Sequence, residues 1–431
     1  MSGQYLSWGR YPNKPQHYKR LNWATDLPLI ESDKVTLPFG NGRSYGDVCL
    51  SESDNVICMK SLNRILSANW KTGIIRAEAG VTIGDILDIS VQNGWFLPVI
   101  PGTKFATLGG AVANDVHGKN HHVRGTFGCH VRRFQLYHCK EFIECSPQSN
   151  YEIFQATIGG LGLTGFITWI EVQLIPVQSG MIDTITERFN HLSDFFRLAN
   201  FYDNSHEYGV AWIDCLAKGN HKGRGTYFAG NHAQYGNKAP KVGSSLKVPF
   251  TPPVSMVNPL TLKLFNEFYW RTKPVKPVQK REGYLGYFFP LDSIHNWNRI
   301  YGSKGFQQYQ CVIPEQFEKD AIDELLSIIA FYNSGSFLAV LKRCGDIKSP
   351  GLLSFPVRGT SLALDFPNTK RLKQLMSAMD GVVRQAKGRI YPAKDANMSG
   401  EDFRLAYPYW SKLEKLKDPS INSHFWKRVT A

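Results

Sequence analysis

The chain has 431 residues, a length that corresponds to two or three domains at roughly 100–200 residues each. A hydrophobic content of 42% argues against a disordered chain, and the lack of any apolar run of about 18 residues argues against a membrane-spanning helix. The net charge of +14 suits an anionic membrane surface or phosphorylated substrates, or simply a solvated basic surface. No nucleic-acid-binding signature is present, so we expect no nucleic-acid partner.

In the first part of the chain, short apolar segments alternate with glycine-rich turns. An apolar strand from Val35 leads into a glycine-rich turn at 40–46, and Thr82 is a plausible N-cap for a helix. Further strands are predicted at 56–59, 73–79, 96–100, 131–137, 141–145 and 166–175, and helices at 81–93 and 151–156. A second glycine-rich turn covers 159–165. This pattern indicates an α+β domain with ligand-binding loops.

After Pro176 the composition changes and aromatic residues become dense. Residues 221–253 carry five glycines and four prolines, which predicts a long loop, in part mobile, of the kind that forms a lid. Strands are predicted at 305–313, 336–341, 353–356 and 361–366, and helices at 315–331 and 370–387. The tail from 389 carries a polar turn followed by an aromatic-rich helix.

Residues 101–130 are the most informative stretch, with six glycines and four histidines. Glycine has no Cβ, so such a segment lets backbone lie against a ligand. The spacing does not match the G-x-G-x-x-G pattern that binds nicotinamide dinucleotides. His121 and His122 have no carboxylate or cysteine at ligand spacing, and we therefore expect no metal. The eight cysteines form no C-x-x-C pair, so we expect reduced thiols and no structural zinc.

Several motifs occur together, in one order along nearly the whole chain: GNGRSYGD at 40–47, PGTKFATLGGAVANDVHGKNHH at 101–122, IGGLGLTG at 158–165, FFPLDSIHNWNRIYG at 288–302, QYQCVIP at 308–314, LKRCG at 341–345, LALDFP at 362–367 and YPAKD at 391–395. On these motifs the chain resembles FAD-linked oxidoreductases of the vanillyl-alcohol-oxidase (PCMH) type. Within them it is most similar to the branch that oxidises a polyprenyl-phosphoryl-ribose.

The resemblance implies an α+β fold with an FAD-binding domain at 1–177 and an antiparallel-sheet substrate domain at 178–387. A C-terminal segment at 388–431 would return to the FAD domain. The first glycine loop could bind the FAD diphosphate through backbone N–H groups. The implied cofactor-binding residues are Gly40, Asn41, Gly42, Arg43, Ser44, Tyr45, Gly46, Asp47, Gly102, Thr107, Leu108, Gly109, Gly110, His117, Gly118, Lys119, Asn120 and Tyr391.

The implied catalytic residues are Lys394, His117 and Tyr45. A lysine beside the flavin could stabilise negative charge on the ring, or take the hydroxyl proton of the sugar if burial lowers its pKa. The implied substrate-binding residues are Gln310, Lys342, Ala363 and, with a purely structural role as the alternative, Asp365.

Two positions depart from the family pattern. Tyr45 stands where many members carry the histidine that bonds the flavin, so we expect non-covalent FAD. Ala363 stands where mycobacterial members carry a cysteine that nitro-aromatic inhibitors modify, so we expect no such modification here. The histidine that Tyr45 replaces is common in alditol and aldonolactone oxidases of the same superfamily, which are the alternative enzyme class.

The resemblance further implies oxidation of the 2′-hydroxyl of a polyprenyl-phosphoryl-ribose, the first half of its epimerisation to the arabinose donor for cell-envelope glycans. A separate NADH-dependent reductase would complete the epimerisation. A flavin-binding scaffold without turnover is a further alternative. The N-terminal residues lack the apolar core of a secretory signal, so we expect a cytoplasmic protein, or one peripheral to the inner membrane, with the periplasmic face left open.

Overall fold

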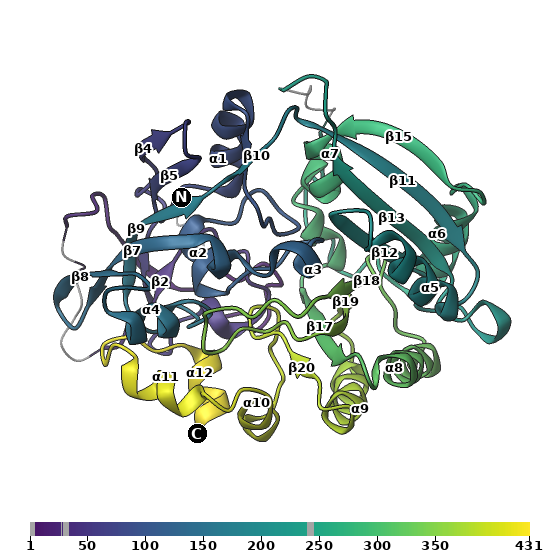
Figure 1. Ribbon diagram of the computed structural model, residues 1–431. Coiled ribbons are helices and arrows are strands. Elements are labelled where there is room, and N and C mark those ends of the chain that lie inside the picture. The colour runs from purple at the N-terminus through teal and green to yellow at the C-terminus, as the bar shows by residue number, and fades with distance from the viewer. Residues whose placement is uncertain (1–4, 27, 29–33, 239–244) are drawn as a thin grey trace.

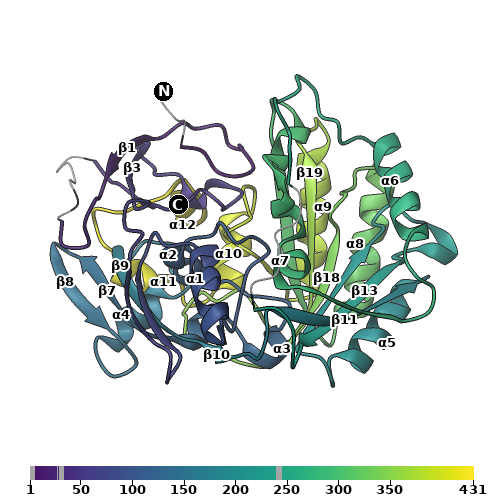
Figure 2. The same ribbon diagram turned by 90° about the horizontal axis from the view of Figure 1, so that it is seen from above.

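The computed structural model describes residues 5–26, 28, 34–238 and 245–431. Two lobes stand side by side, each built on an antiparallel sheet (Figures 1 and 2). This arrangement confirms the predicted α+β class. Among the described residues, no helix is long and apolar enough to cross a membrane.

The first lobe is built on a five-stranded sheet with the order β4-β5-β9-β7-β8. A three-stranded parallel sheet, β1-β3-β2, lies in the same lobe (Figure 2). Thr82 caps α1 as predicted, because its side chain accepts a hydrogen bond from the backbone N–H of Asp85, whose carboxylate accepts one from the N–H of Thr82. The bounds are β1 His17–Arg20, β2 Pro38–Phe39, β3 Asn55–Cys58, β4 Ile65–Asn69, β5 Ile74–Glu78, β6 Trp95–Phe96, β7 Val131–His138, β8 Glu141–Cys145, β9 Phe166–Gln173, β10 Ile175–Pro176, α1 Ile83–Ser90, α2 Leu108–Ala113, α3 His121–Arg124 and α4 Tyr151–Thr157.

The second lobe is built on an eight-stranded antiparallel sheet with the order β15-β11-β13-β12-β18-β19-β17-β20. Helices α8 and α9 pack on β17, and α5 packs on β12 and β13, so one face of this sheet is covered by helices. The bounds are β11 Met181–Phe189, β12 Tyr208–Ile213, β13 Gly225–His232, β14 Leu246–Lys247, β15 Val278–Gly283, β16 Ile294–His295, β17 Phe306–Pro314, β18 Val340–Cys344, β19 Gly359–Pro367, β20 Arg389–Ile390, α5 Leu192–Tyr202, α6 Pro259–Arg271, α7 Tyr284–Phe288, α8 Glu318–Tyr332 and α9 Leu372–Gln385.

The C-terminal segment leaves the second sheet after β20 and runs back beneath the first lobe (Figure 1). It forms α10 (Gly400–Ala406), α11 (Trp410–Leu416) and α12 (His424–Thr430). From α12 the Arg428 guanidinium reaches Asp47 and Asp395, with 2.9 Å between the nitrogen and a carboxylate oxygen in each pair. We keep domain boundaries near 177 and 388 as a proposal, supported by the change of sheet at β11 and by this return.

The prediction of one long loop over 221–253 is wrong, because β13 lies within this range and occupies an interior position in the eight-stranded sheet. The glycines that suggested a loop serve close packing instead. A Cβ on Gly225 would lie 2.2 Å from the backbone oxygen of Trp212. Residues 239–244 of the predicted loop lie outside the described part of the chain.

Other boundaries also differ from the predictions. No strand forms at 353–356, β18 begins only at Val340, and the strands expected at 96–100 and from Val35 reduce to the two-residue strands β6 and β2. The aromatic-rich stretch after Pro176 holds β11, α5 and β12, which composition alone did not separate. Tertiary pairing decides these short elements, because a strand of two residues carries too few side chains to show a period.

Candidate active site

A cavity of about 550 Å³ lies where the two lobes meet. One part of the lining comes from residues 40–45 and 101–110, and we call it the glycine wall. A second part comes from β17, β18 and β19 together with residues 391–394, and we call it the sheet wall.

The first loop of the glycine wall needs its glycines for close packing. Gly42 has φ +58°, and a Cβ there would lie 2.7 Å from the backbone oxygen of Leu6. A Cβ on Gly46 would lie 1.6 Å from the backbone oxygen of Asp395. The loop is therefore wedged between the N-terminal segment and the segment that carries the catalytic lysine expected from the resemblance.

The second loop of the glycine wall is joined to the first. The side-chain amide of Asn41 donates to the carbonyl of Phe105 at 2.9 Å. Thr107 caps α2 by accepting a hydrogen bond from the N–H of Gly110, and the N–H of Gly109 donates to the carbonyl of Ala79. These bonds join the two loops to each other and hold the second loop against the first lobe.

Strand register explains why the substrate residues meet on the sheet wall. Gln308 pairs with Asp365 and Gln310 with Ala363, while Lys342 pairs with Ser361 on the other side of β19. Side chains two residues apart share a face of a strand, so all these residues line the cavity.

His117 connects the two walls. Its ring lies in a buried position, and its Nε2 atom is 3.0 Å from Nε2 of Gln310. An amide nitrogen can only donate, so this imidazole nitrogen accepts and the proton sits on Nδ1. Burial, together with the charges of Lys342, His121 and Lys394, holds the pKa of His117 well below its usual range. The imidazole is therefore neutral at physiological pH.

Lys394 lies over the ring of Tyr45, with 3.8 Å between its Nζ atom and the ring centroid. Burial lowers the pKa of Lys394 to about 7, although the nearby Asp365 carboxylate opposes this shift. Burial also raises the pKa of Asp365 to about 7, against the hydrogen bond at 2.6 Å that Gln308 donates to it. Lys394 can therefore lose and regain its proton near neutral pH.

Lys342 provides a second amine in the cavity. Its Nζ atom is 3.5 Å from the carbonyl oxygen of Gly118, and burial lowers its pKa to about 8.

Ala363 offers only a methyl group at the same surface, so no thiol stands at this position of the sheet wall. The hydroxyl of Tyr391 donates to the carbonyl of Asn114 at 2.8 Å, which fixes its ring beside His117.

Most of the predicted site residues line the cavity, and six do not. Asp47 pairs with Arg428, Lys119 lies 4.2 Å from the ring centroid of Tyr287, and Asn120 donates to the carbonyl of Pro98. Lining residues outside the prediction include Gln308, Ser361, Asn114 and Asp292. Gln308 could have been found, because it stands two residues from Gln310 in a predicted strand. The six predicted residues outside the lining are Gly46, Asp47, Leu108, Gly118, Lys119 and Asn120.

Four buried polar atoms in cavity-lining residues have no hydrogen-bond partner among the described residues. Native proteins leave few such atoms unpaired, so a polar ligand is expected to bind here. An FAD molecule, with its ring edge, ribityl chain and diphosphate, is long enough to face several of them and the glycine wall together. The residues present therefore fit this cofactor. The four atoms are Nε of Arg43, Oδ1 of Asn114, Nδ1 of His117 and Oδ2 of Asp365.

Known proteins resemble the chain along its length. The FAD binding domain family matches residues 30–141. Decaprenylphosphoryl-beta-D-ribose oxidase of Mycolicibacterium smegmatis is 32% identical over 409 residues, covering 90% of this chain and 87% of that protein. L-gulonolactone oxidase of Mus musculus is 24% identical, over 46% of this chain and 47% of that protein. Delta(24)-sterol reductase of Homo sapiens is 28% identical, over 31% and 28% of the two chains.

Proposed function

Because the chain belongs to the family of FAD-dependent oxidoreductases that includes decaprenylphosphoryl-β-D-ribose oxidase, we propose that it oxidises the 2′-hydroxyl of a polyprenyl-phosphoryl-ribose to a 2′-keto sugar. The observation that carries this proposal is the sheet wall, where Lys394, Gln310 and Lys342 face the same cavity as the glycine wall. A separate NADH-dependent reductase would then reduce the ketone and complete the inversion at C2′.

Oxidation of a secondary alcohol removes a hydride from carbon and a proton from oxygen. FAD, when bound, supplies the acceptor for the hydride. Lys394 is the group we assign to the proton, because burial brings its pKa to about 7 and its neutral amine can take the proton from the 2′-hydroxyl. The lysine then returns that proton to solvent, so each turnover leaves the amine as it began.

The other residues of the sheet wall would bind and orient the sugar. Gln310 is held by its bond to His117, so its amide has a fixed direction in the cavity. Lys342 lies on the neighbouring strand and can donate to sugar oxygens or to the phosphate. We assign to these residues the placement of the C2′ carbon, since misplacing a reacting atom by about 1 Å costs on the order of 100-fold in rate.

We propose that FAD is held without a covalent bond. Tyr45 occupies the loop position where a bonding histidine would stand, and Nε2 of His117 is engaged by Gln310. Cys49 also lines the cavity, but burial raises the pKa of its thiol to about 12, which leaves almost no thiolate to attack the ring. Acid precipitation of the purified protein should release the yellow cofactor into the supernatant. Flavin that stays in the pellet would show a covalent link.

The substrate assignment is tested by anaerobic mixing of the flavoprotein with polyprenyl-phosphoryl-ribose. We expect the flavin absorption band to bleach in one turnover and the product to carry a 2′-ketone. The same experiment with an alditol or an aldonolactone is the matched comparison. Bleaching by either of these, with none by the sugar lipid, would transfer the protein to the alternative class of soluble sugar oxidases. A flavin that no substrate bleaches would support a scaffold instead.

We propose that the protein works peripherally on an anionic membrane face, where its lipid substrate resides. Leu260, Leu264 and Phe268 lie on one face of α6 at intervals of four residues and are 65–71% exposed. The apolar side chains of Leu246, Phe250, Val254 and Met256 before this helix are 59–73% exposed. We call these seven residues the apolar patch.

The apolar patch has the neighbours that a lipid-binding surface needs. Exposed basic residues stand close to its members in the sequence, and these can contact anionic headgroups. Within the patch, Leu246 pairs with Ile294 between β14 and β16, and Ile294 lines the cavity. A lipid bound at Leu246 would therefore be next to the cavity wall. The basic residues are Lys247, Lys263, Arg271, Lys276 and Lys280.

Sedimentation with vesicles tests the membrane proposal. We expect binding to vesicles that contain phosphatidylglycerol, weakened by high salt and lost in the double variant Leu264→Asp and Phe268→Asp. Leu405→Asp is the matched control, because Leu405 is 65% exposed and lies on α10, in the C-terminal segment beneath the first lobe (Figure 1). Binding that is independent of salt, or equal loss in the control, would contradict the proposal.

A further inference from the structure

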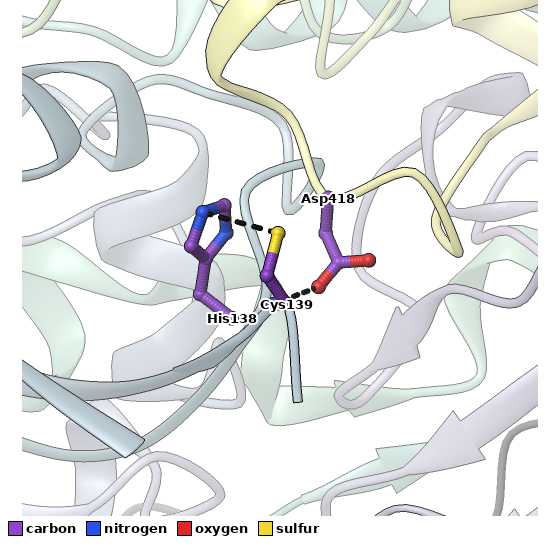
Figure 3. Close-up of side chains that lie close together, drawn as sticks. All are labelled: His138, Cys139 and Asp418. Atoms are coloured by element: carbon purple, nitrogen blue, oxygen red, sulfur yellow. Dashed lines mark hydrogen bonds between the residues drawn. The ribbon is translucent and has the colours of Figure 1, made fainter. Parts of the chain in front are cut away.

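A cluster of three metal-binding side chains lies outside the cavity, where the β7–β8 hairpin meets the C-terminal segment (Figure 3). His138 ends β7, Cys139 opens the turn that follows, and Asp418 comes from the segment between α11 and α12. Their ligand atoms all lie within 4.8 Å of one another. The side chain of Cys139 lies between the imidazole of His138 and the carboxylate of Asp418 (Figure 3).

The histidine is already oriented as a ligand. Its Nδ1 atom is 2.7 Å from the carbonyl oxygen of Thr164. A carbonyl can only accept, so Nδ1 carries the proton and Nε2 presents its lone pair. Metal-binding histidines are held in this way, with the other ring nitrogen donating to a carbonyl or carboxylate.

The spacing of the first two ligand atoms suits a tetrahedral ion. Nε2 of His138 lies 3.4 Å from Sγ of Cys139. Bonds of about 2.0–2.1 Å from zinc to nitrogen and about 2.3 Å to sulfur place two such ligands about 3.6 Å apart at a tetrahedral angle. The separation of the imidazole nitrogen and the thiol sulfur therefore already matches that of two ligands of one zinc ion.

Asp418 supplies a negative charge beside these two ligands. Its side chain is buried. One oxygen accepts the backbone N–H of Cys139 at 2.7 Å, and the other accepts from Ser420. The oxygen that faces Cys139 accepts this one bond and keeps a lone pair, and buried carboxylates are normally paired with a cation or bound to a metal.

The same contacts argue against a cysteine nucleophile of the protease kind. In a catalytic triad the carboxylate orients the histidine. Here Asp418 holds the backbone of Cys139, while the imidazole is held by Thr164. Cys139 is exposed, so an ion can enter from solvent and a water molecule can complete its coordination.

We propose that His138, Cys139 and Asp418 form a surface site for a divalent transition-metal ion of the zinc type. Binding replaces the thiol proton, which passes to solvent, by a bond from sulfur to the metal. The ion would join the β7–β8 hairpin to the C-terminal segment. The N–H of Asp418 donates to the carbonyl of Leu163 at 2.9 Å, and the adjacent Gly162 lines the cavity, so the ion would also support the loop at the active site.

Cobalt titration of the complete flavoprotein, freed of metals by a chelator, tests the site. We expect one Co²⁺ per chain and a thiolate-to-cobalt absorption band. Because loss of a ligand should exceed the 10–100-fold effect of losing a supporting group, Cys139→Ser should raise the Kd by more than about 100-fold and abolish the band. Asp418→Asn should weaken binding similarly, since the amide oxygen keeps the bond to the turn but not the charge.

Cys129→Ser is the matched control, because Cys129 is a partly exposed cysteine without the histidine and carboxylate. It should bind cobalt as the parent protein does. Zinc should also raise the Tm of the parent protein and leave that of Cys139→Ser unchanged. Binding that does not saturate at one ion per chain, or a band of full intensity in Cys139→Ser, would overturn the proposal. Cys139→Ser changes an exposed side chain and should fold normally. This variant therefore tests the metal site even if Asp418→Asn fails to fold.

Discussion

The glycine wall and the sheet wall of the cavity are built on opposite principles. The glycine wall is rich in glycine, and its loops are held by hydrogen bonds and by packing too close for side chains. The sheet wall presents buried amines, amides and a carboxylate from three neighbouring strands and from the segment after β20. The glycine wall suits a large, flat cofactor that is bound by shape. The sheet wall suits proton transfer, because burial shifts the pKa values of its groups toward neutrality.

If this division of labour is correct, removing an amine from the sheet wall should abolish chemistry without removing the cofactor. We expect Lys394→Met to slow anaerobic flavin reduction by about 1,000-fold, within the range of general-base effects, while FAD content stays unchanged. Rapid-mixing absorbance measures the rate. Lys373→Met, at an exposed position on α9, is the control and should react normally. Equal rates in both variants would remove Lys394 from the mechanism.

A methyl group added to the first loop of the glycine wall should instead lower stability and FAD content. Gly46→Ala places a Cβ 1.6 Å from the backbone oxygen of Asp395, and backbone cannot move aside cheaply. We expect a loss of about 3 kcal/mol in unfolding free energy, at the upper end of overpacking effects, together with loss of bound FAD. Gly102→Ala is the matched change, because no heavy atom lies within 4 Å of its Cβ position. Denaturant unfolding compares the two, and equal stability would contradict the packing argument.

The smallest effect concerns the pH dependence of the sheet wall. Only the neutral amine of Lys394 can accept a proton, so flavin reduction should become faster as pH rises through about 7. The Asp365 carboxylate raises the pKa of Lys394, so Asp365→Asn should move the midpoint to lower pH.

Asp380→Asn is the control for that shift. Burial also raises the pKa of Asp380 to about 7, but this residue bonds Tyr309 and does not line the cavity. When rates are measured between about pH 5 and 9, the midpoint of the pH profile should therefore move only in Asp365→Asn. Loss of the pH dependence in Asp365→Asn would show that the carboxylate, and not Lys394, governs the reaction.

Local signals were enough for much of the first lobe. The Thr82 cap and the β7–β8 hairpin follow from residues close together in the chain, and the structure has both where they were predicted. The glycine loops were identified for the same reason, since a tight turn needs its glycines within a few residues. In the second lobe, interpreting glycines as a sign of a loop gave a wrong prediction, because the glycines of β13 allow close contact with other strands of the sheet.

The sequence by itself determined the α+β class, the glycine wall and, through its motifs, the residues expected to meet at a flavin. Only the tertiary structure decided which of them face the cavity. Gln308 lines the cavity although it was not predicted, and Lys119 does not line it although it was. Strand register and burial decide this, and both depend on partners far along the chain. The structure also brought Asp418 to His138 and Cys139 across 279 residues of sequence. No local pattern can encode such a meeting, because it is fixed by the packing of the C-terminal segment against the first lobe.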